Sequence, residues 1–226
     1  IDLSLYEKQI FDSYNDFFTR KIRAEERPVN PDANALVSPS DGKVSVYRIH
    51  ENGHFLIKHT EYTLEQLLQD KKLAKRYLDG HIYVIRLTVD DYHRYCYAAD
   101  GRKSEQRKIA GILHTVNPVA NDVCPIYKMN SREYCLIKTE RFGTLLQMEV
   151  GALMVGKISN NQQGLGFVHK GVEKGRFEFG GSTIILLTQK NVVIPDRDLL
   201  EHTGSGMETL VKMGEQIGRS ANRLDA

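Results

Sequence analysis

Ser182, which follows two glycines, is the residue in this chain whose possible chemistry is easiest to specify. It stands between Gly180-Gly181 and the apolar run Ile184 to Leu187. A serine hydroxyl can attack the carbonyl carbon of the preceding residue and convert the amide to an ester, if the backbone is strained and a base accepts the proton. Glycine at 181 suits this reaction because it tolerates unusual torsions and leaves its carbonyl open. As structure alone, the two glycines indicate a hairpin turn or a bulge.

The ester would be an intermediate on the way to a prosthetic group. β-Elimination from it would leave dehydroalanine, which hydrolyses to a pyruvoyl group at a new N-terminus. A pyruvoyl carbonyl forms a Schiff base with an amine and accepts the electrons released when carbon dioxide leaves. The pair Gly181-Ser182 is therefore compatible with a self-cleaving decarboxylase precursor as well as with a plain turn.

Further reactive side chains occur in two short segments. Asp90-Asp91-Tyr92-His93-Arg94-Tyr95-Cys96 combines acids, an imidazole, a cation and a thiol at the end of an apolar strand, and is equally typical of a polar strand end. Ser38-Pro39-Ser40-Asp41-Gly42 places a carboxylate in a turn, where aspartate often only binds its own backbone. His93 and Cys96 have a spacing that metal ligands use, but no second close pair accompanies them, so we predict no metal site.

The elements around these residues are predicted from apolar segments separated by Gly, Asn, Asp and Pro. Short strands with glycine-rich turns favour antiparallel sheets over alternating strand–helix units. We therefore predict an α+β fold, with an antiparallel β-sheet core, glycine-rich turns and N-terminal helices, as a single domain over residues 1–226. The predicted strands are His81–Leu87, Ile109–Val116, Tyr134–Lys138, Thr144–Val150 and Thr183–Thr188.

Two helical regions are predicted from capping residues. Ser13 and Asp16 have the spacing of a capping box, and aromatic residues follow at helical intervals, so the first 27 residues are predicted to be helical. A second capping box, Thr63 to Gln66, opens a helix that we expect to continue through Leu73. The aromatic face of the first region could rest on a membrane, although such stripes more often pack on their own domain.

Composition excludes several classes of protein. The 226 residues carry 31 Lys and Arg against 29 Asp and Glu, a net charge of +2, which argues against an electrostatic nucleic-acid binder. Hydrophobic residues make up 41% and charged residues 27%, as in soluble globular domains. No apolar run approaches the roughly 18 to 20 residues of a membrane-spanning helix. The three cysteines lack CxxC spacing, which argues against a disulfide framework.

Taken together and in order, these segments resemble the phosphatidylserine decarboxylase family of pyruvoyl-dependent enzymes, from about Phe11 to Gly218. The cleavage segment has the Gly-Gly-Ser-Thr form of one branch of that family. The resemblance is carried by Phe17-Phe18-Thr19-Arg20 with Arg27-Pro28, Ser38-Pro39-Ser40-Asp41-Gly42, Asp91-Tyr92-His93-Arg94, Val116-Asn117-Pro118, Asn130-Ser131-Arg132, Val150-Gly151-Ala152 to Val155-Gly156-Lys157-Ile158, and Lys170-Gly171 to Gly175-Arg176-Phe177 with Gly180-Gly181-Ser182-Thr183.

The resemblance implies roles for individual residues. Ser182 would be the self-cleavage nucleophile and the source of the covalent pyruvoyl group, with the break between Gly181 and Ser182. Residues 1–181 would become a β-subunit and 182–226 an α-subunit, and the two would stay associated. Asp41 resembles the aspartate that orients the base, and His93 resembles the histidine assigned to decarboxylation, protonating the carbanion after carbon dioxide leaves.

Cys96 departs from the family pattern, which usually has a second histidine three residues after His93 as the base of an Asp-His-Ser triad. A thiol with a pKa near 8.5 is a poorer base than imidazole at neutral pH. Three outcomes follow: Cys96 acts as a thiolate with a depressed pKa; another histidine (His93, His114 or His169) substitutes; or cleavage is slow or absent.

The resemblance also implies a substrate and a place of action. It implies conversion of phosphatidylserine to phosphatidylethanolamine. It also implies an enzyme attached peripherally to the cytoplasmic face of an anionic membrane. We expect no nucleic-acid partner, and the family often forms homodimers. Arg94 and Arg132 are candidates for binding the anionic head group, and Arg20 and Lys157 are further candidates by their positions in the motifs. Two alternatives stay open: a pyruvoyl decarboxylase of a soluble amino acid, and an uncleaved lipid-binding relative that has lost self-processing through Cys96.

Overall fold

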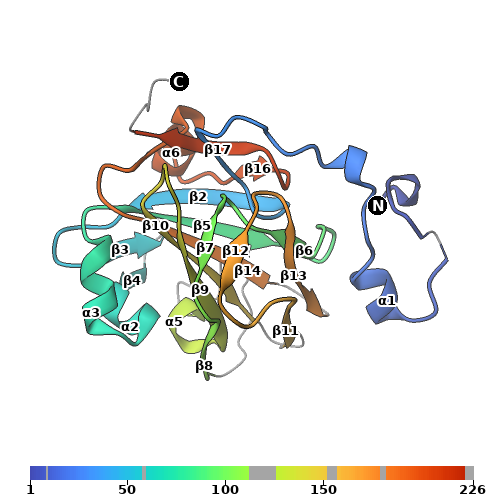
Figure 1. The fold of residues 1–226 in the computed structure, drawn as a ribbon, viewed down its shortest axis with the longest axis horizontal. Coiled ribbons are helices and arrows are strands. Elements are labelled where there is room, and N and C mark those ends of the chain that lie inside the picture. The colour runs from blue at the N-terminus through green and yellow to red at the C-terminus, as the bar shows by residue number, and fades with distance from the viewer. Residues whose placement is uncertain (9, 58–59, 112–125, 152–156, 179–181, 222–226) are drawn as a thin grey trace.

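The computed structural model describes residues 1–8, 10–57, 60–111, 126–151, 157–178 and 182–221 (Figure 1). Antiparallel strands dominate this part of the chain, and the helices are short. The helices are η1 (Leu3–Leu5), α1 (Tyr14–Phe18), η2 (Ala24–Glu26), α2 (Leu64–Leu68), α3 (Lys71–Ala74), η3 (Lys75–Tyr77), α5 (Ile126–Met129) and α6 (Arg197–Gly204).

The strands form one large sheet and three small ones. The large sheet has the order β12-β7-β9-β10-β14-β5-β2-β16, with β8 also paired to β9. The small sheets are β1-β17-β15, β11-β13-β6 and β3-β4. The strands are β1 (Ala35–Val37), β2 (Gly42–Arg48), β3 (His54–Ile57), β4 (Thr60–Thr63), β5 (His81–Leu87), β6 (Arg94–Cys96), β7 (Gly101–Lys103), β8 (Arg107–Ile109), β9 (Arg132–Lys138), β10 (Thr144–Val150), β11 (Lys157–Asn160), β12 (Gly166–Val168), β13 (Glu173–Glu178), β14 (Ser182–Thr188), β15 (Val193–Pro195), β16 (Thr209–Val211) and β17 (Gln216–Ser220).

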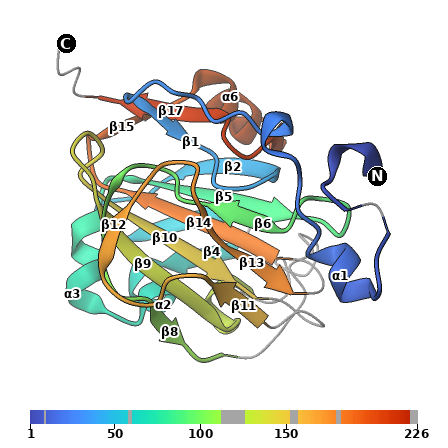
Figure 2. The same ribbon diagram turned by 45° about the vertical axis from the view of Figure 1, so that its right-hand side comes forward.

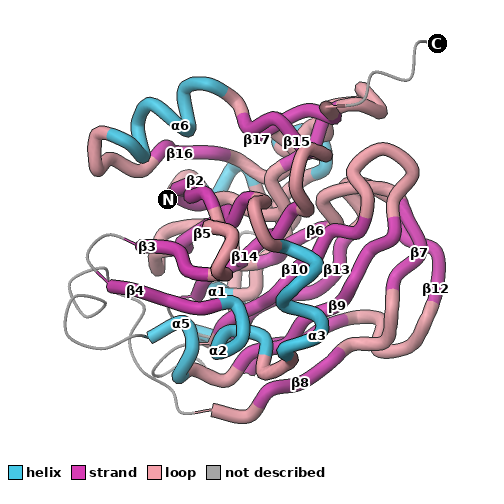
Figure 3. Tube along the Cα trace, turned by 90° about the vertical axis from the view of Figure 1, so that its left-hand side faces the viewer, coloured by secondary structure: helices cyan, strands magenta, loops and turns pink. Residues whose placement is uncertain are grey.

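The large sheet is covered on both faces, because alternate residues of its central strands enter two different apolar clusters. In β14, Ile185 and Leu187 pack against α2, α3 and the β3–β4 hairpin, which Figure 3 shows together on one side of the molecule. Ile184 and Leu186 pack against β6, β13, β1, β17 and α6 on the other side. Side chains on a strand alternate between faces, so Ser182 belongs to the second face, with Ile184.

The predicted α+β class and antiparallel core are confirmed. β5 and β10 have the predicted bounds, and β14 and β9 begin one and two residues earlier than predicted. The predicted strand Ile109–Val116 overlaps β8, Arg107–Ile109, only at Ile109, because Ala110 and Gly111 are not in a strand; residues 112–116 lie outside the described ranges.

The N-terminal helices and the predicted cap are present, but the prediction that all of the first 27 residues are helical is wrong, because η1, α1 and η2 each span only three to five residues. The amide of Asp16 donates to Ser13 Oγ at 3.1 Å, but α1 ends at Phe18. Beyond it, Ile22 pairs with Tyr6 in an isolated bridge and the chain packs on residues 90–94. An isolated helix of this length is marginal in water, so tertiary contacts override the helical pattern.

The second predicted helix is interrupted. Gln66 N donates to Thr63 Oγ1 at 3.2 Å, which confirms the cap. Gln69 then takes a left-handed backbone conformation and ends α2, while Asp70 caps α3 by accepting from Leu73 N at 2.8 Å. Within the described ranges, no helix is both long enough and apolar enough to cross a membrane.

Candidate active site

One end of the large sheet gathers the segments that the sequence singles out (Figure 2). β14 begins at Ser182, which pairs with Leu87 at the end of β5. β5 also pairs with β2, whose first residue, Gly42, follows Asp41. Because neighbouring strands are antiparallel, the start of β2 and the start of β14 share an edge with the end of β5.

The same edge continues across the sheet on the other side of β14. Val150, at the end of β10, pairs with Thr183 and with Arg132, the first residue of β9. Gly151 N donates to Ser131 O at 2.9 Å and extends this pairing. The first residues of β2, β14 and β9 and the last residues of β5 and β10 therefore lie at one edge.

Ser182 is fully buried at this edge, and among the described residues its Oγ has no hydrogen-bond partner. Gly181, which the prediction places on the other side of the cleaved bond, lies outside the described residues together with Gly180. The burial of Ser182 agrees with a reactive hydroxyl that is shielded from water.

Asp41 is held by an arginine for which the sequence suggested no role. Arg27 Nε donates to Asp41 Oδ1 at 2.8 Å, a second bond joins Arg27 Nη2 to Oδ2, and Met213 N donates to Oδ1 at 2.9 Å. The next position, Gly42, requires glycine, because its φ is +146° and an added Cβ would lie 2.7 Å from Arg86 O. The carboxylate of Asp41 is thus bound to a guanidinium and a backbone amide.

His93 is fully buried, and its ring is oriented by two neighbours. Its Nδ1 lies 2.9 Å from Asp91 O, and its ring centroid lies 4.0 Å from that of Phe18. A carbonyl oxygen only accepts hydrogen bonds, so Nδ1 carries the hydrogen and Nε2 is the basic nitrogen of the neutral ring. Phe177 N donates to His93 O at 3.0 Å, which joins His93 to β13, the strand that precedes Ser182 in the chain.

Cys96 lies against the turn that carries Asp41. Its thiol donates to Ser38 O at 3.9 Å, its amide donates to Pro39 O at 2.8 Å, and the residue is fully buried. Burial raises the pKa of the Cys96 thiol to about 12, and the Asp41 charge also raises it. This shift is opposite to the one that a thiolate base requires, so the first of the three outcomes for Cys96 is not supported.

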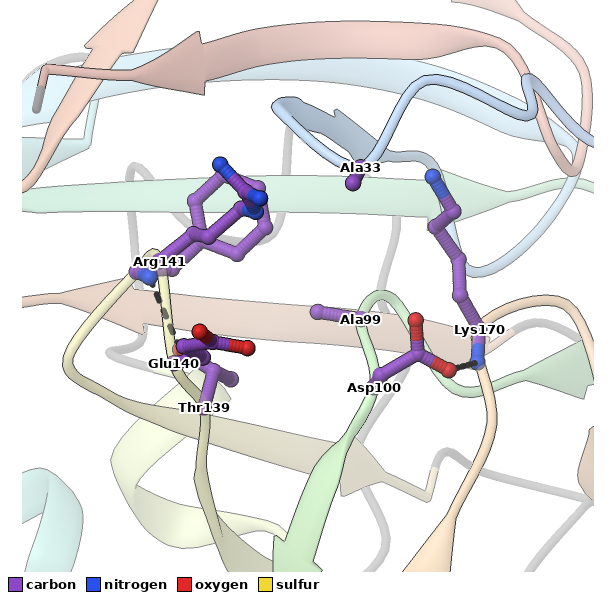
Figure 4. Close-up of a pocket in the computed structure, with 8 residues that line it drawn as sticks. Ala33, Ala99, Asp100, Thr139, Glu140, Arg141 and Lys170 are labelled. Carbon is purple, nitrogen blue, oxygen red and sulfur yellow. Dashed lines mark hydrogen bonds between the residues drawn. The ribbon is translucent and has the colours of Figure 1, made fainter. Parts of the chain in front are cut away.

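The alternative histidines are placed differently. His114 lies outside the described residues, whereas His169 is exposed and its Nδ1 lies 3.3 Å from Asp100 Oδ1. Asp100 lines a cavity of about 150 Å³ with the turn between β9 and β10 and with Lys170 (Figure 4). That turn and Ser182 are at opposite ends of β10, about 20 Å apart at about 3.4 Å per residue. Of the described histidines proposed as substitutes, only His93 is at the Ser182 end.

Arg94 and Arg132, the predicted head-group ligands, are both engaged inside the protein. Arg94 Nη1 pairs with Glu173 at 2.9 Å, and Arg94 Nε donates to Thr19 O at 2.9 Å. Arg132 donates to the carbonyls of Leu67 and Gln66 at 2.8 and 3.0 Å, at the end of α2, and burial lowers its pKa to about 10. Both guanidiniums organise the chain around the site, and their contact with substrate stays a prediction.

A buried ion pair on the Ser182 face was missed by sequence reasoning. Glu149 Oε2 lies 2.6 Å from Lys174 Nζ, and both side chains are completely buried. Asn160 and Gln106 also donate to Oε2, at 3.2 and 3.1 Å. Burial raises the pKa of Glu149, while Lys174 opposes that shift. The available signal was an acidic residue in a mostly apolar strand, two residues before Gly151.

Comparison with known proteins agrees with this arrangement. Residues 14–219 match the family model described as phosphatidylserine decarboxylase. The chain belongs to the phosphatidylserine decarboxylase family. It is 46% identical over 220 residues to phosphatidylserine decarboxylase proenzyme 2 of Clostridium acetobutylicum. The aligned region covers 97% of this chain and 75% of the relative.

Two further relatives have similar names. The chain is 42% identical over 226 residues to the phosphatidylserine decarboxylase proenzyme of Fusobacterium nucleatum, covering 98% of this chain and 75% of the relative. It is 41% identical over 222 residues to the proenzyme of Clostridium perfringens, covering 96% and 76%. Membership of this decarboxylase family gives the buried serine at the start of β14 a chemical context.

Proposed function

We propose that this protein cleaves its own backbone between Gly181 and Ser182 and then decarboxylates phosphatidylserine to phosphatidylethanolamine. The observation that carries the proposal is buried Ser182 at the start of β14, where it pairs with the end of β5. Asp41 directly precedes β2, the other neighbour of β5, and His93 lies in the segment that follows β5 and accepts from Phe177 N of β13. The names of its relatives supply the substrate, and the word proenzyme in those names supports a processed precursor.

The residues at this edge fit a pyruvoyl group derived from Ser182. Among the described residues, its buried Oγ has no hydrogen-bond partner. Conversion of Ser182 to a pyruvoyl group would therefore break no hydrogen bond between this Oγ and those residues. The group would be held in place by the pairing of β14 with both β5 and β10. When formed, a pyruvoyl group supplies an electron sink for loss of carbon dioxide from an amino acid.

We assign proton transfer at this edge to His93. The Nδ1–H bond to Asp91 O leaves Nε2 as the atom that can accept the proton of Ser182 and, later, deliver one to the decarboxylated substrate. Cys96 is unsuited to this task, because its thiol keeps its proton at neutral pH. Asp41 stabilises the adjoining turn through Arg27.

Membrane contact is proposed through the N-terminal segment. Ile10, which precedes α1, has 82% of its surface exposed, and Tyr14, the first residue of α1, has 55% exposed. Apolar and aromatic side chains of this kind can enter the boundary between lipid head groups and acyl chains. Contact there would bring a lipid substrate to the side of the molecule where α1 packs near His93.

The proposal is tested with the full chain and its Ser182→Ala variant, on vesicles of phosphatidylserine and on free serine. We expect the parent to release carbon dioxide from the vesicles and to carry a carbonyl group that reacts with hydrazines, and the variant to do neither. Release from free serine alone would contradict the lipid substrate. Release by Ser182→Ala would contradict the pyruvoyl chemistry.

A further inference from the structure

The segment Phe17–Arg20 interlocks with the segment that carries His93. Arg94 Nε donates to Thr19 O at 2.9 Å, and Arg20 Nη2 reaches the carbonyls of Asp90 and Asp91 at 3.4 Å. Figures 1 and 2 both show α1 beside the ends of β6 and β13. Two motifs that are distant in sequence are thus bound together, since Arg20 and Asp90 are 70 positions apart.

Phe18 is the member of this segment that contacts the imidazole. Its side chain is 1% exposed, and the two rings are tilted by 38° at a centroid separation of 4.0 Å. An aromatic ring at this distance restricts rotation of the imidazole about its side-chain bonds, because a buried neighbour leaves no space for another rotamer.

Arg20 supports the same arrangement from the backbone side. Arg20 as a whole is 3% exposed, and its guanidinium lies over the rings of Tyr6 and Phe17, at 4.6 and 4.8 Å from their centroids. It also reaches Asp91 O, the carbonyl that accepts from His93 Nδ1. The imidazole is therefore held at its edge by a carbonyl that Arg20 steadies and on its face by Phe18.

We propose that Phe18 is a positioning residue for His93, which keeps Nε2 aimed for proton transfer at the Ser182 edge. This inference rests on the proposed function, because it assigns Phe18 a part in the proton transfer given to His93. Misplacement of a catalytic group by about 1 Å can cost about a hundredfold in rate. Loss of the Phe18 ring should therefore slow self-cleavage by about tenfold to a hundredfold.

The test is a double-mutant cycle on the rate of self-cleavage of the full chain, followed by intact mass. We expect Phe18→Leu to slow cleavage at least about tenfold in the parent and less than about twofold in a His93→Gln background. Phe18→Tyr, which keeps the ring, should cleave within about threefold of the parent. Equal slowing by Phe18→Leu in both backgrounds would overturn the inference, because Phe18 would then act independently of His93.

Phe55→Leu is the matched control for a buried aromatic ring. Phe55 is also 1% exposed and stacks on Tyr62, but it packs on the opposite face of the sheet. It should lower the melting temperature about as much as Phe18→Leu while leaving the cleavage rate within about twofold. If Phe55→Leu slows cleavage as much as Phe18→Leu, general destabilisation explains both and the inference fails.

The proposed role of His93 in proton transfer and the proposed role of Phe18 in positioning His93 are contradicted by different results. Parent-like cleavage by His93→Gln would remove the role of His93, whereas slow His93→Gln with fast Phe18→Leu would remove only the role of Phe18. If Phe18→Leu does not fold, Phe18→Met replaces it, since methionine adapts to irregular space.

A spectroscopic measurement replaces the cycle if His93→Gln stops cleavage completely. Nitrogen NMR would then report the tautomer of His93 in Ser182→Ala chains, with and without the Phe18→Leu substitution. One tautomer is expected when Phe18 is present, and a mixture of the two when it is replaced. A single tautomer that is unchanged by Phe18→Leu would overturn the inference.

Discussion

The two ends of the large sheet both carry a histidine and an acidic residue, but the Ser182 end buries them and the other end exposes them. At the Ser182 end, the side chains of Ser182 and His93 are buried and Asp41 is nearly so. At the other end, His169 is exposed and pairs with an exposed Asp100, beside an open cavity. Histidine, acid and cation occur at both ends, so residue type alone does not distinguish them.

The difference lies in how much each polar group depends on its neighbours. A buried group must be satisfied by the protein or remain costly, whereas an exposed group exchanges a lost partner for water. Substitutions at the Ser182 end should therefore have large and coupled effects, and substitutions at the cavity end small and independent ones. Three variants test this contrast in order of decreasing expected effect, and a fourth is the control for the first.

Lys174→Met should destabilise the fold most. It leaves Glu149 buried without its cation, and breaking a fully buried pair costs about 3 to 5 kcal/mol. Burial already raises the pKa of Glu149, and loss of Lys174 raises it further, so ionised Glu149 becomes unfavourable in the folded state as pH rises. Urea unfolding should show a larger loss of free energy at pH 8 than at pH 5.

Lys190→Met is the control for that change. Lys190 follows β14 at the opposite end of the sheet and pairs with Asp79 at 3.0 Å, with 58% of its side chain exposed. Its loss should cost no more than about 1 kcal/mol. Equal costs for Lys174→Met and Lys190→Met would remove the contrast between the two ends.

Cys96→Ala should have a moderate effect on stability and almost none on cleavage chemistry. With a pKa of about 12, only about one molecule in 10⁵ carries the thiolate at pH 7. Self-cleavage measured by intact mass should therefore stay within about threefold of the parent once folding is complete. A hundredfold loss, with unchanged melting temperature, would mean that the Cys96 sulfur takes the proton.

Arg141→Ala should have the smallest effect. Arg141 lines the cavity and donates to Asn34 Oδ1 at 2.9 Å, far from Ser182 along β10. We expect the free energy of unfolding to change by less than about 0.5 kcal/mol and the cleavage rate to match the parent. A marked loss of cleavage would show that the two ends are coupled.

Much of the frame of the site was predictable from the sequence. Apolar segments bounded by turn residues gave the bounds of β5 and β10, and the antiparallel class then places the start of β14 beside the end of β5. The resemblance directed attention to Ser182, Asp41 and His93 without stating their contacts.

What could not be predicted depends on packing between distant segments. α1 ends after five residues, and the contacts of Phe18 with His93 and of Arg27 with Asp41 join regions with no local signal for each other. The protonation of Cys96 depends on complete burial, which residue type and spacing do not specify. Lys174 in turn stands in a glycine-containing, charged stretch that does not suggest a buried position.

The most direct test of self-cleavage is to measure whether the peptide bond between Gly181 and Ser182 is intact. Intact mass spectrometry of freshly purified full-length protein should resolve two polypeptides, residues 1–181 and a shorter one that begins at position 182 with a blocked N-terminus. Ser182→Ala should give one chain. A parent protein that remains a single chain after prolonged incubation at neutral pH, while folded, would contradict self-cleavage at Ser182.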